Sequence, residues 1–419
     1  MSRIVYTLVV RSLLPWAVLH LLWRARRQPD YLRHCGERFA RYPGVTPEAR
    51  PTIWLHAVSV GETRAAQPLV AALRERFPGY RILFTHMTPT GRATSESLFG
   101  DSVERIYLPY DTPGAMHRFL DRYRPDFGLI METELWPNLI AACRRCKLPV
   151  YLVNARLSAR SARRYARFPT LSGEALGKLT AIGAQGEEDA RRLRELGARA
   201  ITVTGNLKFD IVASLDQLEL GATFRARRGK RLAFLAASTR EGEEALILDA
   251  WRRVGAGETA LLVIVSRHPQ RFGEVEALAR DRGFRLQRRS DDADLAPETD
   301  VLLGDSMGEM FAYYASADLA FIGGSLLDYG SQNLIEAAAC GTPMLIGPST
   351  RNFAEAAAAA LDCGAASPIR SAEDLAQQAL ALLHDEAARL AMGAAGREFA
   401  ARHRGATERT LALLTPAAR

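Results

Sequence analysis

Residues 317–348 of the chain read ADLAFIGGSLLDYGSQNLIEAAACGTPMLIGP and contain, in order, the patterns of a strand, a glycine turn, a helix and a second strand. The apolar run 319–322 predicts a strand that is buried on both faces of a parallel sheet. Asn333 predicts a helix N-cap, residues 334–340 predict the helix, and Gly341 predicts its end. Residues 344–346 predict the next strand. This succession is the repeating unit of a doubly wound α/β sheet.

Ligands of open α/β sheets bind beyond the carboxyl ends of the strands. We expect the backbone amides of residues 323–325 to face such a ligand, because glycine lets the backbone approach closely. The start of the following helix favours an anion, and Glu336 lies one turn further on, where a carboxylate can accept hydrogen bonds from a ribose diol. The spacing of Asn333 and Glu336 is also that of a capping box, in which the glutamate only caps its own helix. Both interpretations stay open at this point.

Short apolar segments alternate with helical patterns along the rest of the chain, which indicates parallel βαβ units throughout. An amphipathic helix is expected over 63–77, and the polar, basic segment 215–231 predicts a linker and interdomain helix. We expect two doubly wound domains, 28–212 and 213–419, that face each other across a cleft. The expected strands are 52–57, 82–85, 105–108, 127–131, 150–153 and 180–183 in the first half, and 231–236, 261–265, 284–286 and 301–303 before the opening stretch.

The composition of the chain indicates which kinds of partner it suits. The chain has 419 residues and a formal net charge of +8, which suits anionic partners such as phospholipid, a phosphorylated substrate or nucleic acid. Five cysteines are too few and too scattered for a disulfide framework, so we expect a reducing compartment. Cys143 and Cys146 have no second pair at a zinc-ligand spacing, and we expect no metal.

The first residues predict a membrane anchor over 1–27. Residues 4–23 are apolar except for Arg11, His20 and a few small polar groups, and their length just spans a bilayer. Arg11 near the middle costs about 2.5–3.5 kcal/mol on insertion scales. Arg24, Arg26 and Arg27 follow, and such a cluster stays on the cytoplasmic side. No cleavage site for a signal peptide follows the apolar run. A helix that spans the bilayer, one that lies in the interface and a buried core helix remain as alternatives.

Acidic side chains follow two of the expected strands. Glu62 opens the helix after strand 52–57, where the helix dipole is expected to keep it ionised, as a base must be before it takes a proton. Acidic residues are also common in a first turn for stability alone. Glu132 and Glu134 follow strand 127–131 beside Trp136, either as site residues or as solvated acids. A serine hydrolase is disfavoured, because Ala57 stands where a nucleophile elbow needs glycine.

Basic and glycine-flanked segments follow other expected strands. A run of arginines after strand 150–153 either receives phosphate groups or forms a solvated helix face. Lys208, Arg267 and His268 each follow a strand, and Gly304–Glu309 offers glycine-flanked amides. No P-loop lysine motif or strand-linked G-x-G-x-x-G is present, which disfavours ATPases and dehydrogenases. Asp292 and Asp294 lie in a polar run and predict a solvated loop. The arginines of the run are Arg156, Arg160, Arg163 and Arg164.

Taken together, these segments resemble those of the bacterial 3-deoxy-D-manno-octulosonic acid (Kdo) transferases of lipopolysaccharide synthesis. The resemblance extends over nearly the whole chain. One departure is Gly330-Ser331-Gln332, where relatives carry glycine and histidine. The shared segments are HAVSVGET, MTPTG, YLPYD, METELWPNLI, NARLS, TGNLKFD, RHPQRF, GDSMGE and the opening stretch.

The resemblance implies a GT-B glycosyltransferase fold and an inverting reaction without metal or other cofactor. It implies CMP-Kdo as donor, lipid IVA as acceptor, and work at the cytoplasmic face of the cell inner membrane, with no nucleic acid partner. Glu62 is then the general base, and Glu132 and Lys208 support the transition state. The residues implied for the CMP site are Arg267, His268, Met307, Gly308, Glu309, Asn333, Leu334, Ile335 and Glu336.

Two other functions stay open. One is a GT-B transferase with a different nucleotide-sugar donor. The other is a basic membrane-surface or nucleic-acid-binding protein without catalysis, although such a protein has no need of Glu62 and Glu132 at the ends of strands.

Overall fold

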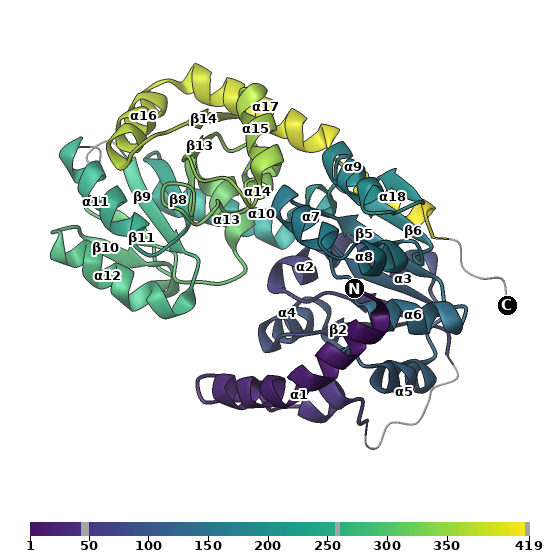
Figure 1. Cartoon of the computed structure of the whole chain (residues 1–419). Helices are drawn as coiled ribbons and strands as arrows, with labels where there is room; N and C mark the ends of the chain where they lie inside the picture. Colours follow the sequence, from purple (N-terminus) through teal and green to yellow (C-terminus); the bar gives the residue numbers. More distant parts are fainter. Residues whose placement is uncertain (43–49, 256–259, 415–419) are drawn as a thin grey trace. The chain divides into compact units, whose positions relative to one another are not determined.

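The computed structural model describes residues 1–42, 50–255 and 260–414. The chain divides into two compact units (Figure 1). The first comprises Met1–Ile211 with Arg404–Arg419, and the second comprises Val212–His403. Within the described ranges, each unit is built on one parallel seven-stranded sheet with helices packed around it. The prediction of two doubly wound α/β domains is therefore confirmed.

The sheet of the first unit has the strand order β3-β2-β1-β4-β5-β6-β7. The order reverses between β1 and β4, which is the topological switch point where such sheets bind ligands. The strands are β1 Thr52–His56, β2 Arg81–His86, β3 Glu104–Tyr107, β4 Phe127–Met131, β5 Val150–Ala155, β6 Ala181–Ala184 and β7 Ile201–Val203. The helices are α1 Arg3–Ala25, α2 Val60–Ala65, α3 Gln67–Arg76, α4 Pro89–Phe99, α5 Pro113–Tyr123, α6 Pro137–Arg145, α7 Ala159–Ala166, α8 Pro169–Leu176, α9 Glu187–Glu195 and α18 Ala406–Ala412.

The sheet of the second unit has the order β10-β11-β9-β8-β12-β13-β14, with its switch point between β8 and β12. The strands are β8 Leu232–Thr239, β9 Ala260–Ser266, β10 Leu286–Arg288, β11 Val301–Leu303, β12 Leu319–Ile322, β13 Met344–Ile346 and β14 Ala366–Pro368. The helices are α10 Leu215–Arg228, α11 Glu243–Arg253, α12 Phe272–Asp281, α13 Met310–Ser316, α14 Ile335–Cys340, α15 Ala354–Asp362, α16 Ala372–His384 and α17 Glu386–Arg402.

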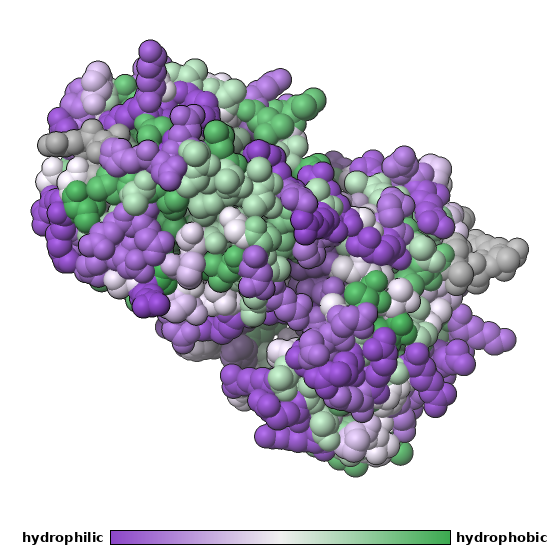
Figure 2. Space-filling model, turned by 90° about the horizontal axis from the view of Figure 1, so that it is seen from above, coloured by the Kyte–Doolittle hydropathy of each residue, from purple (hydrophilic) through white to green (hydrophobic). Residues whose placement is uncertain are grey.

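The cores form because the central strands are apolar on both faces, as parallel strands between helices must be. Strands β1, β4, β9 and β12 are buried along their full lengths. In the second unit, Phe234 of β8 stacks on Trp251 of α11 with 5.1 Å between ring centroids. Hydrophobic residues that remain visible on one face of the molecule are interspersed with hydrophilic ones (Figure 2).

Two expected helices differ from the structure. The helix expected over 63–77 is two helices, α2 and α3, which meet at Ala66. Pro68 lies in the first turn of α3 and lacks the N–H that would continue α2. The expected interdomain helix over 215–231 is α10, which belongs to the second unit and packs on α13. Gly221 permits this close approach, because a Cβ there would lie 2.9 Å from that of Ala315.

The expected second domain, 213–419, ends earlier than the sequence indicated, because the last described segment packs on the first unit. The carboxylate of Asp210 accepts the backbone N–H groups of Gly405 at 2.7 Å and Thr407 at 2.5 Å. Arg409 donates to the carbonyl oxygen of Thr204 at 2.8 Å. Leu411 lies in the core of the first unit. Helix α18 thus returns to the first sheet after the chain has completed the second.

Helix α1 is long and apolar enough to cross a membrane, and most of its large apolar side chains are exposed. Ile4 is 73% exposed, Trp16 62% and Leu19 65%. The alternative of a buried core helix is therefore wrong. The helix is nevertheless attached to the first unit near its start, where Tyr6 donates to the buried carboxylate of Asp111 at 2.9 Å. Near its end, Leu21 packs with Tyr31.

The close approach of β1 and β4 yields a stability prediction. An alanine Cβ at Gly128 of β4 would lie 2.4 Å from Cε3 of the buried Trp54 in β1. We expect Gly128→Ala to lower the free energy of unfolding by about 1–3 kcal/mol, the usual cost of overpacking. Urea unfolding measures the change. Gly79→Ala is the control, because a Cβ there meets nothing within 4 Å. Equal stability of the two variants would contradict the packing described here.

Candidate active site

Glu62 lies in the first turn of α2, directly after β1 at the switch point of the first sheet. Ser59 is the N-cap residue, and its hydroxyl donates to Glu62 Oε1 at 2.8 Å and accepts the Glu62 N–H at 3.3 Å. Glu62 Oε2 accepts the backbone N–H of Val58 at 2.8 Å. The carboxylate is only 7% exposed. These bonds fix both carboxylate oxygens in one orientation.

The acid–base state of Glu62 differs from the expectation. The sequence indicated that the helix dipole keeps this carboxylate ionised, which is wrong. Burial, and next the negative charge of Glu132, raise the pKa of Glu62 to about 7, although the bonds from Val58 and Ser59 oppose the rise. Desolvation and a like charge both disfavour the ionised form. A carboxylate with a pKa near 7 is well suited to accept a proton at neutral pH.

Glu132 follows β4, which pairs with β1 across the same switch point. Its φ of 56° is left-handed, a strained conformation for a side chain of this kind. The next residue, Thr133, donates through its hydroxyl to the carbonyl oxygen of Arg156, and its own carbonyl accepts Tyr165 OH at 3.1 Å. Burial raises the pKa of Glu134 as well, with Glu132 adding to the rise. The structure thus brings the carboxylates of residues 62, 132 and 134 to one edge of the sheet.

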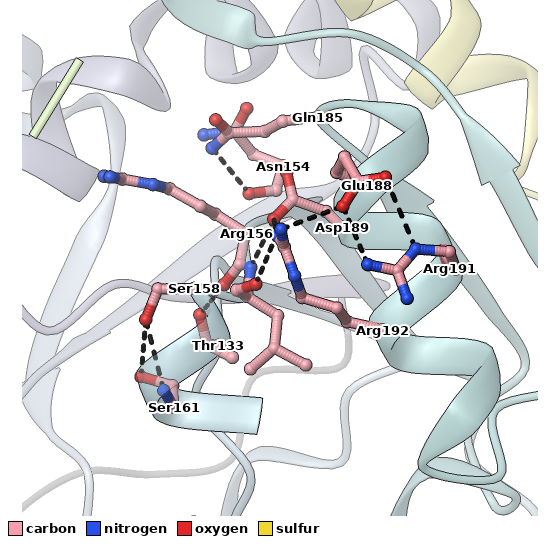
Figure 3. Close-up of polar contacts among 11 residues, drawn as sticks. Thr133, Asn154, Arg156, Ser158, Ser161, Gln185, Glu188, Asp189, Arg191 and Arg192 are labelled. Atoms are coloured by element: carbon pink, nitrogen blue, oxygen red, sulfur yellow. Dashed lines mark hydrogen bonds and ion pairs between the residues drawn. The ribbon is translucent and has the colours of Figure 1, made fainter. Parts of the chain in front are cut away.

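Arg156 lies in the loop that follows β5, and side chains of α9 hold this loop in place (Figure 3). Asp189 Oδ1 accepts the N–H of Leu157 at 2.7 Å, and Arg192 donates to the Leu157 carbonyl at 3.2 Å. In Figure 3 the Arg156 side chain extends away from the Asp189–Arg192 contacts. The sequence did not indicate that Asp189 positions this loop, because Asp189 stands among other acidic residues in the first turn of α9 and cannot be told from them by sequence.

The other arginines of the run all lie on α7. Arg160, Arg163 and Arg164 are exposed. Within the described ranges, none of the three forms an ion pair with an acidic side chain. They therefore form a solvated basic face, as one of the two sequence interpretations held, and such a face remains available to an anion.

Lys208 lies in the 3₁₀ turn η4, Leu207–Asp210, which packs against α2, the helix of Glu62. Asn154 of β5 accepts the Leu207 N–H through Oδ1 at 3.0 Å, and Asn206 accepts the Lys208 N–H at 3.0 Å. Asn154 is fully buried and has a left-handed φ of 52°. The turn that carries Lys208 is therefore fixed by side chains from two segments.

In the second unit, the glycine turn after β12 does not have the expected role. The Gly323 N–H donates to the Ala237 carbonyl at 2.8 Å, and the Gly324 N–H donates to Glu243 Oε2 at 2.7 Å. The expectation that these two amides face a ligand is therefore wrong. The turn is instead closed by contacts within the fold, and a Cβ at Gly323 would lie 2.5 Å from the Ala237 carbonyl oxygen.

Helix α14 begins at Ile335, one residue later than expected, with Leu334 in place of Asn333 at the N-cap position. Asn333 accepts the Ile335 N–H through Oδ1 at 3.1 Å and donates through Nδ2 to Glu336 Oε1 at 2.9 Å. The Asn333–Glu336 contact joins two side chains, whereas a capping box joins the glutamate to a backbone amide. The Leu334 and Ile335 side chains are buried, so their backbone alone can meet a ligand.

Arg267 and His268 follow β9, and Arg267 N–H donates to the Thr239 carbonyl of β8 at 3.0 Å. Burial, and then the charges of Arg240, Arg267 and Arg271, lower the pKa of His268, so the imidazole is neutral at neutral pH. Sequence reasoning missed Arg240, because it ended the strand at residue 236. Strand β8 extends to Thr239, which places Arg240 at its carboxyl end.

Met307, Gly308 and Glu309 form the loop between β11 and α13. Met307 is 52% exposed, and Gly308 has a left-handed φ of 86° that favours glycine. Glu309 accepts a bond from Arg289 at 3.3 Å and one from the Ser306 hydroxyl at 2.5 Å. Segments at the carboxyl ends of β8, β9, β11 and β12 therefore surround one edge of the second sheet.

Comparison with known protein families gives a match for each of the two units. Residues 33–211 match the family described as 3-deoxy-D-manno-octulosonic-acid transferase (kdotransferase), and residues 230–399 match glycosyl transferases group 1. The chain is 46% identical over 426 residues to the 3-deoxy-D-manno-octulosonic acid transferase of Bordetella pertussis, with 98% of each chain covered. It is 36% identical over 421 residues to that of Haemophilus influenzae, with 99% of each covered.

Solved structures agree at the level of the fold. The UDP-GlcNAc 2-epimerase of Neisseria meningitidis aligns with a TM-score of 0.59 at 15% identity, over 86% of this chain and 99% of the epimerase. A glycosyltransferase from Rickettsia africae aligns with a TM-score of 0.57 at 14% identity, over 87% of this chain and 98% of that one. With its two parallel seven-stranded sheets in a GT-B fold, the chain belongs to the 3-deoxy-D-manno-octulosonic acid transferase family and is a glycosyltransferase that transfers Kdo.

Proposed function

We propose that the chain transfers Kdo from CMP-Kdo to lipid IVA, with inversion at the anomeric carbon and with Glu62 as the general base. The observation that carries the proposal is the environment of Glu62. Its carboxylate is buried, held by two hydrogen bonds and next to Glu132, and its pKa is raised to about 7. A base for a sugar hydroxyl needs a fixed position and a pKa near the working pH.

In this mechanism an acceptor hydroxyl oxygen attacks the anomeric carbon of Kdo while the bond from that carbon to the CMP phosphate breaks. The hydroxyl proton passes to Glu62, and CMP leaves with the bonding electrons. The negative charge that grows on the phosphate needs cations and hydrogen-bond donors. Arg240 and Arg267, which follow β8 and β9, supply the positive charge, and the neutral imidazole of His268 supplies a hydrogen bond. Glu336 binds the ribose diol. Glu132 and Lys208 stabilise charge around the reacting hydroxyl.

The acceptor is a bisphosphate carried in a membrane, and the first unit has two features that suit it. The exposed arginines of α7 are able to pair with its phosphate groups. Helix α1 carries an exposed row of large apolar side chains. The basic charge of the whole chain favours an anionic membrane surface. We assign the enzyme to the cytoplasmic face of the inner membrane on these grounds.

Attachment of its start favours an α1 that lies in the membrane interface over one that crosses the bilayer. Near its start, Arg3 and Thr7 bond to Asn138 Oδ1 at 3.2 and 3.0 Å, and Tyr6 bonds to Asp111. The chain that leaves the end of α1 enters the same domain, where Arg38 donates to the Met87 carbonyl at 3.0 Å. A helix whose start is fixed to that domain cannot place its two ends on opposite sides of a membrane. Its apolar side chains can still enter the boundary between headgroups and acyl chains.

The first prediction concerns the base. Glu62→Gln keeps the shape of the side chain and removes its basicity, so turnover should fall by about 10²–10⁴-fold, while CMP binding stays nearly unchanged. Because the base must be deprotonated, wild-type turnover should rise with pH through about 7, and the variant should lack this rise. A transfer assay with CMP-Kdo and lipid IVA, with products resolved by mass, measures both.

Glu134→Gln is the matched control for Glu62→Gln, since it neutralises a half-buried carboxylate whose pKa Glu132 also raises, and it should cost much less activity. A melting curve of each variant checks the fold. Near-normal turnover of Glu62→Gln at saturating CMP-Kdo would rule out Glu62 as the base, and Glu132 would replace it.

The second prediction concerns the donor. CMP should raise the melting temperature of the protein and UMP much less, because a ligand that binds only the native state stabilises it by mass action. Glu336→Ala should remove most of the CMP shift. If the variant melts far lower without ligand and still responds to CMP, Glu336 is only a structural partner of Asn333. A larger shift with UMP than with CMP would indicate a different donor.

The third prediction concerns the membrane. Trp16→Glu with Leu19→Glu should abolish flotation with phosphatidylglycerol-containing vesicles and leave the melting temperature unchanged, because both side chains are exposed. Gln67→Glu with Thr170→Glu, at two exposed positions of the first unit outside α1, controls for the added negative charge. Vesicle binding that survives in the α1 variant and in a protein lacking residues 1–27 would place the membrane contact elsewhere.

A further inference from the structure

The carboxylate of Glu243 is buried inside the second unit and surrounded by backbone amides. Oε2 accepts the N–H groups of Gly324 at 2.7 Å and Arg240 at 2.9 Å. Oε1 accepts those of Leu326 at 3.0 Å and Leu327 at 3.4 Å. Glu243 is 0% exposed. One side chain from the start of α11 thus joins the segment after β8 to the glycine turn after β12, across the switch point of the sheet.

The same turn holds the segment that carries the nucleotide residues. The carbonyl oxygen of Gly324 accepts the Ser331 N–H at 2.8 Å, and the carbonyl oxygen of Gly323 accepts the Gln332 N–H at 2.9 Å. Asn333 and Glu336 follow directly in sequence. A series of hydrogen bonds therefore leads from Glu243 through the glycine turn to Gln332, and the chain continues from there to the start of α14.

A carboxylate in a nest of amides occupies the place that a phosphate takes in many glycine turns. The amides that Glu243 occupies cannot at the same time bind the phosphate of a donor. They are used to set the shape of the turn instead, and the incoming phosphate must be met by side chains such as Arg240 and Arg267. All four N–H donors are satisfied only when both terminal atoms of the side chain accept hydrogen bonds, as the two oxygens of a carboxylate do. Glutamine cannot replace it, because its amide nitrogen carries hydrogens and only donates.

We propose that Glu243 is a positioning residue of the donor site: its buried carboxylate fixes the glycine turn and Arg240, and through them the start of α14, in the geometry that binds the nucleotide. The proposal rests on the function proposed above, that this edge binds CMP-Kdo. Glu243 does not touch the donor. Its loss should therefore weaken donor binding without changing the chemistry of transfer once the donor is bound.

The neighbouring residue offers a matched control. Glu244 is equally buried, but its Oε1 accepts bonds from the Thr239 hydroxyl at 2.8 Å and Arg271 at 2.7 Å. Neither contact is to the glycine turn. Replacement of either glutamate by glutamine removes a buried negative charge at the start of α11, so a general loss of stability should be common to both variants. Only the Glu243 variant should also lose nucleotide affinity.

The test compares CMP affinity by calorimetry, donor KM and kcat for wild type, Glu243→Gln and Glu244→Gln. We expect Glu243→Gln to weaken CMP binding and raise the donor KM by about 10-fold or more, since buried amides lose their acceptor. Its kcat at saturating donor should stay within about 3-fold of wild type, and Glu244→Gln should keep wild-type CMP affinity. If Glu243→Gln binds CMP as tightly as wild type, or if both variants lose affinity equally, the proposal is overturned.

Failure of the proposed donor assignment has a different signature: the wild type itself would not bind CMP, and the Glu243 role stated here would fall with it. If Glu243→Gln does not fold, hydrogen exchange on the ligand-free wild type decides the question. The amides of Gly324 and Leu326 should exchange slowly because the carboxylate holds them. Exchange as fast as that of exposed loop amides would overturn the proposal.

Discussion

The pairing of two central strands in each sheet is the constraint on which both sites depend. In the first unit β1 pairs with β4, and in the second β8 pairs with β12. An aspartate fixes each pair at its amino-terminal edge: Asp126 accepts the Thr52 N–H at 2.7 Å, and Asp318 accepts the Ala233 N–H at 2.8 Å. Hydrogen bonds to a charged group contribute about 1.5–3 kcal/mol. A slip of register at either pair would displace every residue at the opposite edge.

At that opposite edge, each unit has a buried glutamate that accepts hydrogen bonds from backbone amides, but the surroundings of the two carboxylates differ. Glu62 and Glu243 are both buried carboxylates in a first helical turn that accept backbone amides. Burial raises the pKa of Glu243 as well, but four hydrogen bonds from backbone N–H groups oppose the rise. Glu62 has a single backbone donor, one hydroxyl and a like charge nearby, and its pKa reaches about 7. Glu243 thus has a backbone donor for each of its four hydrogen bonds, whereas Glu62 also stands beside a second carboxylate.

The sequence was sufficient to predict the fold class, most strands and the strand ends that carry Glu62, Glu132, Lys208 and Arg267, because parallel strands leave apolar runs with glycine or polar residues directly after them. It was not sufficient where the answer depends on contacts between distant segments. The return of α18 to the first unit depends on Asp210, almost two hundred residues earlier in the chain. The use of the Gly324 amide by Glu243 spans a crossover between strands. The raised pKa of Glu62 depends first on burial in the folded chain and then on Glu132, which only the sheet order brings close.

Backbone strain occurs at the same strand ends, as it does at several other positions of the described chain. Glu132 after β4, Asn154 in β5 and Ser238 in β8 all have left-handed φ values, of 56°, 52° and 53°. Residues other than glycine rarely adopt this backbone conformation, and each instance costs on the order of 1–3 kcal/mol. At Asn154 the strained backbone accompanies the bond to Leu207 that fixes the turn of Lys208, and at Ser238 it accompanies the irregular pairing of β8 with β9 just before Arg240. A regular strand would carry these side chains onto the faces of the sheet, into the helices. The strained residues turn the chain at the edge of the sheet instead, so the stability lost there accompanies the exit of polar residues from the ends of the strands.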